Sequence, residues 1–231
     1  MAPMSGGGAM AMAWLPMCGR SWIGAAASFL GMWTLMMAAM MLPSLIPVLW
    51  QYRRSVRRAG ALPSVLLMGP LAAGYFLVWT LPGAAVYLSS AATMAAMMRY
   101  PALARAAPVA IGLVVLIAGA LQLTGWKAHH LACCRDDRCR GSPDCGHTPP
   151  AAVLSALRRG LRHGFHCAQC CAGLTAALVV IGIMDVPAMI AVTAGITLER
   201  LAPAGERVAR IIGVLVIAAG LLLTLRAAGL G

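Results

Sequence analysis

Two histidines and three cysteines fall within nine residues of the sequence, in the segment RHGFHCAQCCAGL. Thiolate and imidazole groups are ligands that soft and borderline metal ions such as Cu(I) and Zn(II) prefer. On a helix, at 100° per residue, all five side chains lie on one face, within an arc of about 140°. The segment therefore predicts a metal site made of His163, His166, Cys167, Cys170 and Cys171.

That arc is too wide for all five groups to meet one ion. Neighbours three or four residues apart, such as Cys167 with Cys170 or His166 with Cys170, can share an ion. We therefore expect ligands from another helix, or a second ion, to complete the site. The alternative is that the cysteines act only as small apolar side chains, which so dense a group of ligands disfavours.

A run of methionines offers a second set of soft donors. In LMMAAMML the methionines have the same relative spacing as the ligands of HCAQCC, and thioether sulfur also suits Cu(I). The run predicts a soft-metal site at Met36, Met37, Met40 and Met41. Methionine is also a flexible filler between helices, so helix packing alone is the alternative.

Two further groups of candidate ligands have looser spacing. The polar segment from Lys127 to Arg162 is dense in histidine and cysteine but matches no zinc-ribbon pattern. The segment TMAAMMRYP adds three methionines at helical spacing. We expect these groups to supply secondary metal ligands: His129, His130, Cys133, Cys134, Cys139, Cys145, His147, Met94, Met97 and Met98.

The elements that carry these residues are predicted to be transmembrane helices. The 231-residue chain is 61% hydrophobic and 10% charged, whereas soluble domains carry roughly 25% charged residues. Apolar runs that can cross a hydrocarbon core of roughly 30 Å recur along the chain, without the alternation of a barrel. The sequence predicts an all-α polytopic bundle of about six spans, with five spans plus a re-entrant hairpin as the alternative. The expected spans are residues 23–50, 62–90, 102–124, 170–184, 186–198 and 211–225.

These spans divide the chain into four parts. Residues 1–21 are expected to form a flexible Met/Gly-rich tail, residues 22–126 hold three helices, and residues 163–231 hold three more. Between them, residues 127–162 are expected to form a Cys/His-rich loop that ends in a basic surface helix over residues 151–162.

Single residues refine this picture. Pro43 and Pro47 predict a kink in the first span. Asp185 is expected in the turn between the fourth and fifth spans. Glu199 is expected to reach the membrane interface at the end of the fifth span, because a carboxylate within the hydrocarbon would cost about 2.5–3.5 kcal/mol.

The formal net charge of +12 does not indicate a nucleic-acid partner, because the basic residues are segregated by loop. Fourteen of the 18 lysines and arginines fall on one side of the predicted spans. The positive-inside rule puts that side in the cytoplasm and both termini outside, with the lipid bilayer as the partner of the basic residues. We therefore expect a multi-pass protein of the bacterial cytoplasmic membrane, whose clustered thiols face the reducing compartment.

The chain resembles a bacterial family of predicted metal-binding integral membrane proteins. The matching pieces are WTLMMAAMMLPS, LQLTGWK, GLRHGFHCAQCC and LER, in this order along most of the chain. The resemblance implies a metal-binding role for the ligands of HCAQCC and for the methionine run. In the loop, His130 and Cys134 stand where this family tends to have two spaced cysteines.

The predicted function is therefore the binding of a soft metal ion, Cu(I) ahead of Zn(II), and its transport or its delivery to a metallochaperone or copper enzyme. The sequence contains no ATP-binding loop and no nucleophile elbow that would indicate an enzyme. The alternative is a membrane thiol-disulfide oxidoreductase, because Cys167 and Cys170 form a C-x-x-C motif at a helix N-terminus, where thiols are reactive. Such enzymes work outside the cytoplasm, so this alternative requires the motif to face outward.

Overall fold

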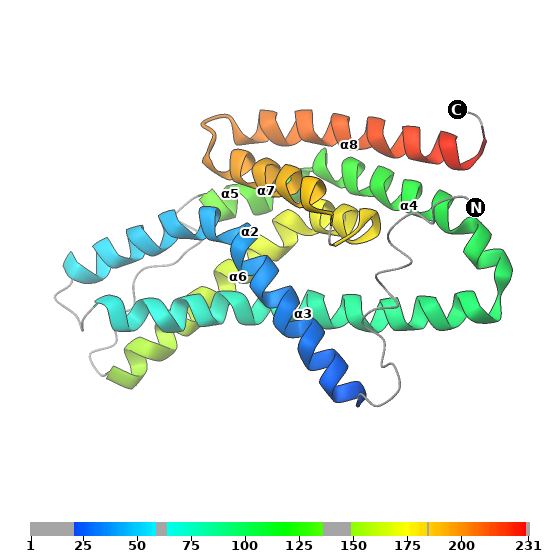
Figure 1. The fold of residues 1–231 in the computed structure, drawn as a ribbon. Coiled ribbons are helices and arrows are strands. Elements are labelled where there is room, and N and C mark those ends of the chain that lie inside the picture. The colour runs from blue at the N-terminus through cyan, green and yellow to red at the C-terminus, as the bar shows by residue number, and fades with distance from the viewer. Residues whose placement is uncertain (1–20, 59–63, 136–148, 184, 230–231) are drawn as a thin grey trace.

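In the computed structural model, the protein is a bundle of α-helices (Figure 1). The structure describes residues 21–58, 64–135, 149–183 and 185–229, and these ranges contain helices but no strand. In chain order the described helices are α2 Trp22–Arg58, α3 Ser64–Arg99, α4 Pro101–Gln122, α5 Gly125–Arg135, α6 Pro149–Ile181, α7 Val186–Leu201 and α8 Gly205–Ala227.

Five of the described helices are long and apolar enough to cross a membrane. These candidate spans are Trp22–Arg54, Leu66–Arg99, Pro101–Gln122, Ala151–Ile181 and Gly205–Ala227. α7, with 16 residues, is shorter than the roughly 20 residues that a straight span needs. The predicted helical membrane bundle is confirmed, with five long apolar helices where about six spans were expected, and with two shorter described helices, α5 and α7.

α2 changes direction about halfway along its 37 residues (Figure 1). Pro43 and Pro47 lie in the middle part of this helix, where the missing backbone donors weaken the helical hydrogen-bond ladder. The predicted kink is therefore present, in a helix that continues on both sides of the two prolines.

α6 begins well before the HCAQCC segment. Residues 151–162, expected as a separate surface helix, are continuous with that segment in one helix of 33 residues. α5 takes up the first part of the expected loop. Cys139, Cys145 and His147 lie outside the described residues, as does the N-terminal tail.

Close packing of α3 against α6 sets the position of the HCAQCC segment. A Cβ atom on Gly160 would overlap the backbone carbonyl of Leu71, and one on Gly164 would lie 2.9 Å from the carbonyl oxygen of Tyr75. Larger residues would push the two helices apart, because small residues are what lets membrane helices approach this closely. The crossing brings Tyr75 of α3 to Cys167 of α6.

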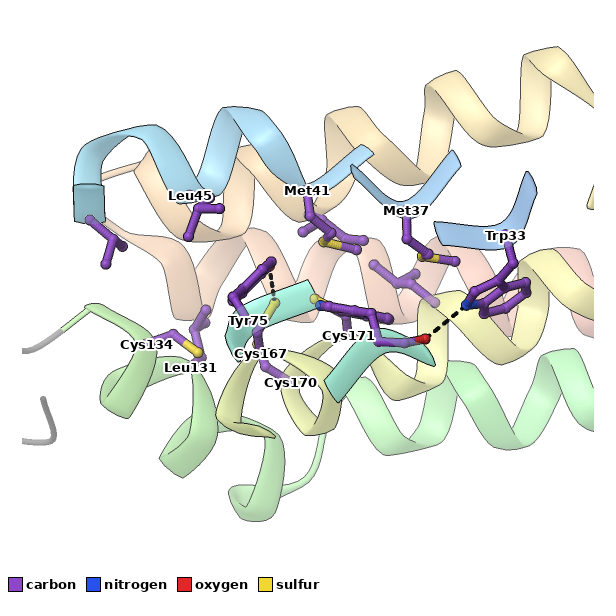
Figure 2. Close-up of a cluster of buried hydrophobic side chains, with 14 of the residues drawn as sticks. Trp33, Met37, Met41, Leu45, Tyr75, Leu131, Cys134, Cys167, Cys170 and Cys171 are labelled. Atoms are coloured by element: carbon purple, nitrogen blue, oxygen red, sulfur yellow. Dashed lines mark hydrogen bonds between the residues drawn. The ribbon is translucent and has the colours of Figure 1, made fainter. Parts of the chain in front are cut away.

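The main core cluster combines aromatic rings with sulfur atoms. Trp33 and Tyr75 are fully buried in it, and the Trp33 indole N–H donates to the backbone oxygen of Trp79 at 2.9 Å. Figure 2 shows these rings in one cluster with methionine side chains of α2 and cysteine side chains of α5 and α6. The interior of the bundle is therefore not purely aliphatic, and the sulfur atoms within it are candidates for chemistry.

Candidate metal centre

Four cysteine sulfurs gather in the interior of the bundle, where α5 and α6 meet. Cys167, Cys170 and Cys171 of α6 are at most 1% exposed, and Cys134 of α5 is 5% exposed. All four are free thiols in the same core cluster, and Figure 2 shows them around Tyr75. We call these four cysteines the sulfur centre.

Two side chains from other helices contact the sulfur centre. The Tyr75 hydroxyl oxygen lies 2.8 Å from Cys167 Sγ. From α7, one guanidinium nitrogen of Arg200 donates to Cys134 Sγ at 3.6 Å and to Cys171 Sγ at 3.7 Å. One cation therefore bridges sulfur atoms that come from two different helices.

A buried polar network adjoins the sulfur centre. Lys127 Nζ of α5 donates to one carboxylate oxygen of Glu199 at 2.7 Å, and Gln122 of α4 donates to the other at 2.9 Å. The Lys127 and Glu199 side chains are 3% and 1% exposed. Burial raises the pKa of Glu199, and the Lys127 ammonium opposes this. Two donors therefore hold the carboxylate of Glu199, which was expected at the membrane interface, inside the bundle.

Two histidines face one another beside the sulfur centre. The Nδ1 atoms of His130 on α5 and His166 on α6 lie 3.2 Å apart. His130 is 8% exposed, and His166 is partly exposed. Burial lowers the pKa of His130, and the neighbouring His166 lowers it further, which favours the neutral form that binds metals. We call these two residues the imidazole pair.

The cysteines one turn further along both helices also form a pair. Cys134 follows His130 by four residues on α5, and Cys170 follows His166 by four residues on α6. A hydrogen bond with Cys170, together with burial, raises the pKa of Cys134. We call Cys134 and Cys170 the sulfur pair. α5 therefore places one histidine and one cysteine, both candidate ligands, against the predicted face of α6.

Other predicted ligands lie outside the sulfur centre. The His163 ring stacks on Tyr75, with ring centroids 5.7 Å apart and planes inclined by 27°. On α5, His129 Nε2 lies 3.9 Å from Cys133 Sγ, and Cys133 is not part of the core cluster that holds the four sulfurs. His163 therefore lies on the predicted face of α6, but its ring packs against Tyr75 and not among the four sulfurs.

The predicted methionine ligands divide into two groups. Met37 and Met41 are fully buried in the core cluster of the sulfur centre, and Figure 2 shows their side chains pointing from α2 into that cluster. Met36 is partly buried against the same cluster, and Met40 is buried. The structure therefore places sulfur from α2 beside the cysteines of α5 and α6.

A second group of methionines lies at the far end of α3. Met94, Met97 and Met98 fall in the last turns of that helix, more than roughly 25 Å along its axis from Tyr75. Within the described residues, no three His, Cys, Asp or Glu side chains already surround one point as ligands would surround an ion. The sulfur centre is therefore a set of neighbouring donors rather than a closed cage.

The polar residues in contact with the sulfur centre or beside it were not predicted from the sequence. Arg200 and Lys127 are indistinguishable from loop charges there, and Tyr75 lies within an apolar span. A signal was nevertheless present in two motifs of the family resemblance. LQLTGWK contains Gln122 and Lys127, and LER contains Glu199 and Arg200.

The family model named PpoB2, described as a copper chaperone, matches residues 30–223 of the chain. This range includes the sulfur centre, the imidazole pair and the methionine run of α2. No curated protein and no solved structure matches the chain.

Proposed function

The chain belongs to the PpoB2 family of copper chaperones, and we propose that it binds Cu(I) at the sulfur centre and delivers the ion to a partner. The observation that carries this proposal is the meeting of four buried cysteine sulfurs from α5 and α6. Soft thiolate ligands select Cu(I), with Zn(II) as the second candidate for a cysteine-rich site. The buried thioethers of Met37 and Met41 add soft donors from α2.

Arg200 supports a role in delivery rather than storage. Thiolates bring negative charge into a bundle interior, where an unpaired charge is costly. The guanidinium of Arg200 donates to Cys134 Sγ and Cys171 Sγ, so it is placed to compensate the charge that appears when these thiols lose their protons. A bound Cu(I) brings its own positive charge and replaces these contacts, and they re-form when it leaves. Such an exchange lowers the cost of releasing the ion.

We place the sulfur centre near the cytoplasmic side of a bacterial inner membrane, with both chain termini outside. The excess of basic residues in the loops on that side supports this orientation. Delivery then involves a cytoplasmic or membrane partner, such as a metallochaperone or a copper enzyme. In this arrangement the thiols face a compartment that keeps them reduced.

Metal analysis of the detergent-purified protein tests the proposal. After anaerobic loading with Cu(I) or Zn(II), wild type should retain Cu(I) at a fixed ratio to protein. The triple variant Cys167→Ser, Cys170→Ser, Cys171→Ser should lose it. Cys133→Ser is the matched control, because Cys133 is also buried but lies outside the core cluster of the sulfur centre. It should bind as wild type does.

Two outcomes would contradict the proposal. Retention of Cu(I) by the triple variant would move the site away from α6. Absence of bound metal in wild type, with Cys167 and Cys170 oxidised to a disulfide in a parallel thiol count, would favour the oxidoreductase alternative. The family match gives no support to that alternative.

A further inference from the structure

The imidazole pair and the sulfur pair are consecutive steps along the contact between α5 and α6. On both helices the cysteine follows the histidine by four residues, which is a rise of about 6 Å. Because the offset is the same on each helix, the line between the two imidazoles and the line between the two sulfurs lie one turn apart. An ion could pass from one pair to the other without leaving this contact.

The two pairs also differ in how deeply they lie. In the sulfur pair, Cys170 is 1% exposed and Cys134 is 5% exposed. In the imidazole pair, His130 is 8% exposed and His166 is partly exposed. An ion that arrives from outside the bundle therefore reaches the imidazole pair first.

We propose that the imidazole pair is a separate first binding site for Cu(I), which receives the ion and passes it to the sulfur pair. This inference rests on the proposed function, and it adds a place and an order of binding to it. The transfer runs from the imidazole pair to the sulfur pair because thiolate is the softer ligand and holds Cu(I) more strongly than imidazole does.

The separation of the two imidazoles suits transient binding. With metal–nitrogen bonds of roughly 2.0–2.1 Å, two nitrogen atoms 3.2 Å apart subtend an angle of roughly 100–106° at the ion. Two-coordinate Cu(I) prefers a linear arrangement, so the pair alone leaves the ion incompletely coordinated. The open positions can hold a ligand of the incoming carrier or, later, a sulfur of the sulfur pair. Both exchanges then proceed without a free ion.

Each step is an exchange of ligands with no change in oxidation state. A hydrogen bond between the two Nδ1 atoms needs one of them to carry a hydrogen. Binding uses both Nδ1 lone pairs, so that ring loses its hydrogen from Nδ1 and gains one at Nε2. In the second step two copper–sulfur bonds form, two copper–nitrogen bonds break, and the protons of the thiols pass to water. The ion enters and leaves each step as Cu(I).

The test is the rate at which the full-length protein in detergent takes Cu(I) from its coloured complex with bicinchoninate, followed anaerobically by stopped flow. His166→Phe removes one nitrogen of the pair at a partly exposed position, and His130→Phe with His166→Phe removes both. His129→Phe is the matched control: His129 is the exposed neighbour of His130, its Nε2 lies 3.9 Å from Cys133 Sγ, and phenylalanine can keep the edge-on contact of its ring with His130. His130→Cys restores a metal ligand at the deeper position.

We expect the imidazole variants to take up Cu(I) at least about tenfold more slowly, with a final affinity within about threefold of wild type. His129→Phe and His130→Cys should keep the wild-type rate. Unchanged uptake by His166→Phe and by the double variant would overturn the proposal. So would a loss of affinity as large as that of Cys170→Ser, since the histidines would then belong to one common site. If wild type takes no Cu(I) from the probe, the proposed function itself fails, whereas the other two outcomes leave it standing.

Discussion

The buried ion pair between Lys127 and Glu199 gives the sharpest prediction about stability. Its two atoms are 2.7 Å apart and its side chains are 3% and 1% exposed. At an effective dielectric constant of about 20, charges at that distance attract by roughly 6 kcal/mol. Desolvation of the two ions cancels most of this gain, so the net contribution of the intact pair is small. Removing one partner is different, because the remaining charge stays buried.

We therefore expect Lys127→Met and Glu199→Met each to lower the free energy of unfolding by about 3–5 kcal/mol. The double variant should be more stable than either single one, because it leaves no uncompensated charge behind. The measurement is unfolding of the detergent-solubilised protein by added SDS, followed by circular dichroism, for wild type and the three variants.

The exposed pair between Glu206 and Arg210 is the matched control. Its atoms are 4.0 Å apart and its side chains are 61% and 71% exposed. Arg210→Met should cost less than about 1 kcal/mol. The reasoning would be refuted if Lys127→Met cost as little as that control, or if the double variant lost the sum of the two single losses. Either result would mean that water reaches the Lys127–Glu199 pair.

Two further predictions concern the crossing of α3 and α6. Tyr75→Phe removes the hydroxyl that lies 2.8 Å from Cys167 Sγ. It should lower the free energy of unfolding by about 0.5–1.5 kcal/mol in the same SDS assay, without changing the amount of Cu(I) bound. A loss of bound Cu(I) would instead make the phenol a ligand. Gly160→Ala should cost about 1–3 kcal/mol, because its Cβ atom would overlap the carbonyl of Leu71. Gly31→Ala in α2, where nothing lies near the added atom and no proline follows, should be neutral or slightly stabilising; equal effects at both glycines would contradict the packing argument.

Much of the fold could be predicted from the sequence because a bilayer restricts the chain so strongly. Apolar runs of sufficient length predict helices, and the kink in α2 follows from Pro43 and Pro47. The residues at which the helices begin and end were harder to predict. Residues 151–162 have the composition of a surface helix, but nothing in their sequence stops the helix before His163, so α6 continues through them. Helical propensity without a stop signal favours one long helix over two short ones.

The candidate site could be predicted only in part, because helical periodicity describes one helix at a time. It places the cysteines of α6 on one face, but it cannot say which neighbour that face meets. His163 lies on the same face, yet its ring stacks on Tyr75 of α3. Cys134, one of many loop candidates in the sequence, lies at the contact with Cys170. Such partners are set by helix packing, which the pattern of a single segment does not encode.

The burial of Lys127 and Arg200 also bears on the predicted orientation, since both belong to the fourteen basic residues assigned to the cytoplasmic side. Inside the bundle, Lys127 pairs with the Glu199 carboxylate and Arg200 donates to two sulfur atoms. These partners, rather than the side of the membrane, explain where the two side chains lie. Without them the count on that side is still twelve, against four on the other. The excess of basic residues that the positive-inside rule uses is therefore kept without Lys127 and Arg200. The two cations are better understood as parts of the candidate metal centre, where Lys127 links α5 to Glu199 of α7 and Arg200 links α7 to sulfur atoms of α5 and α6.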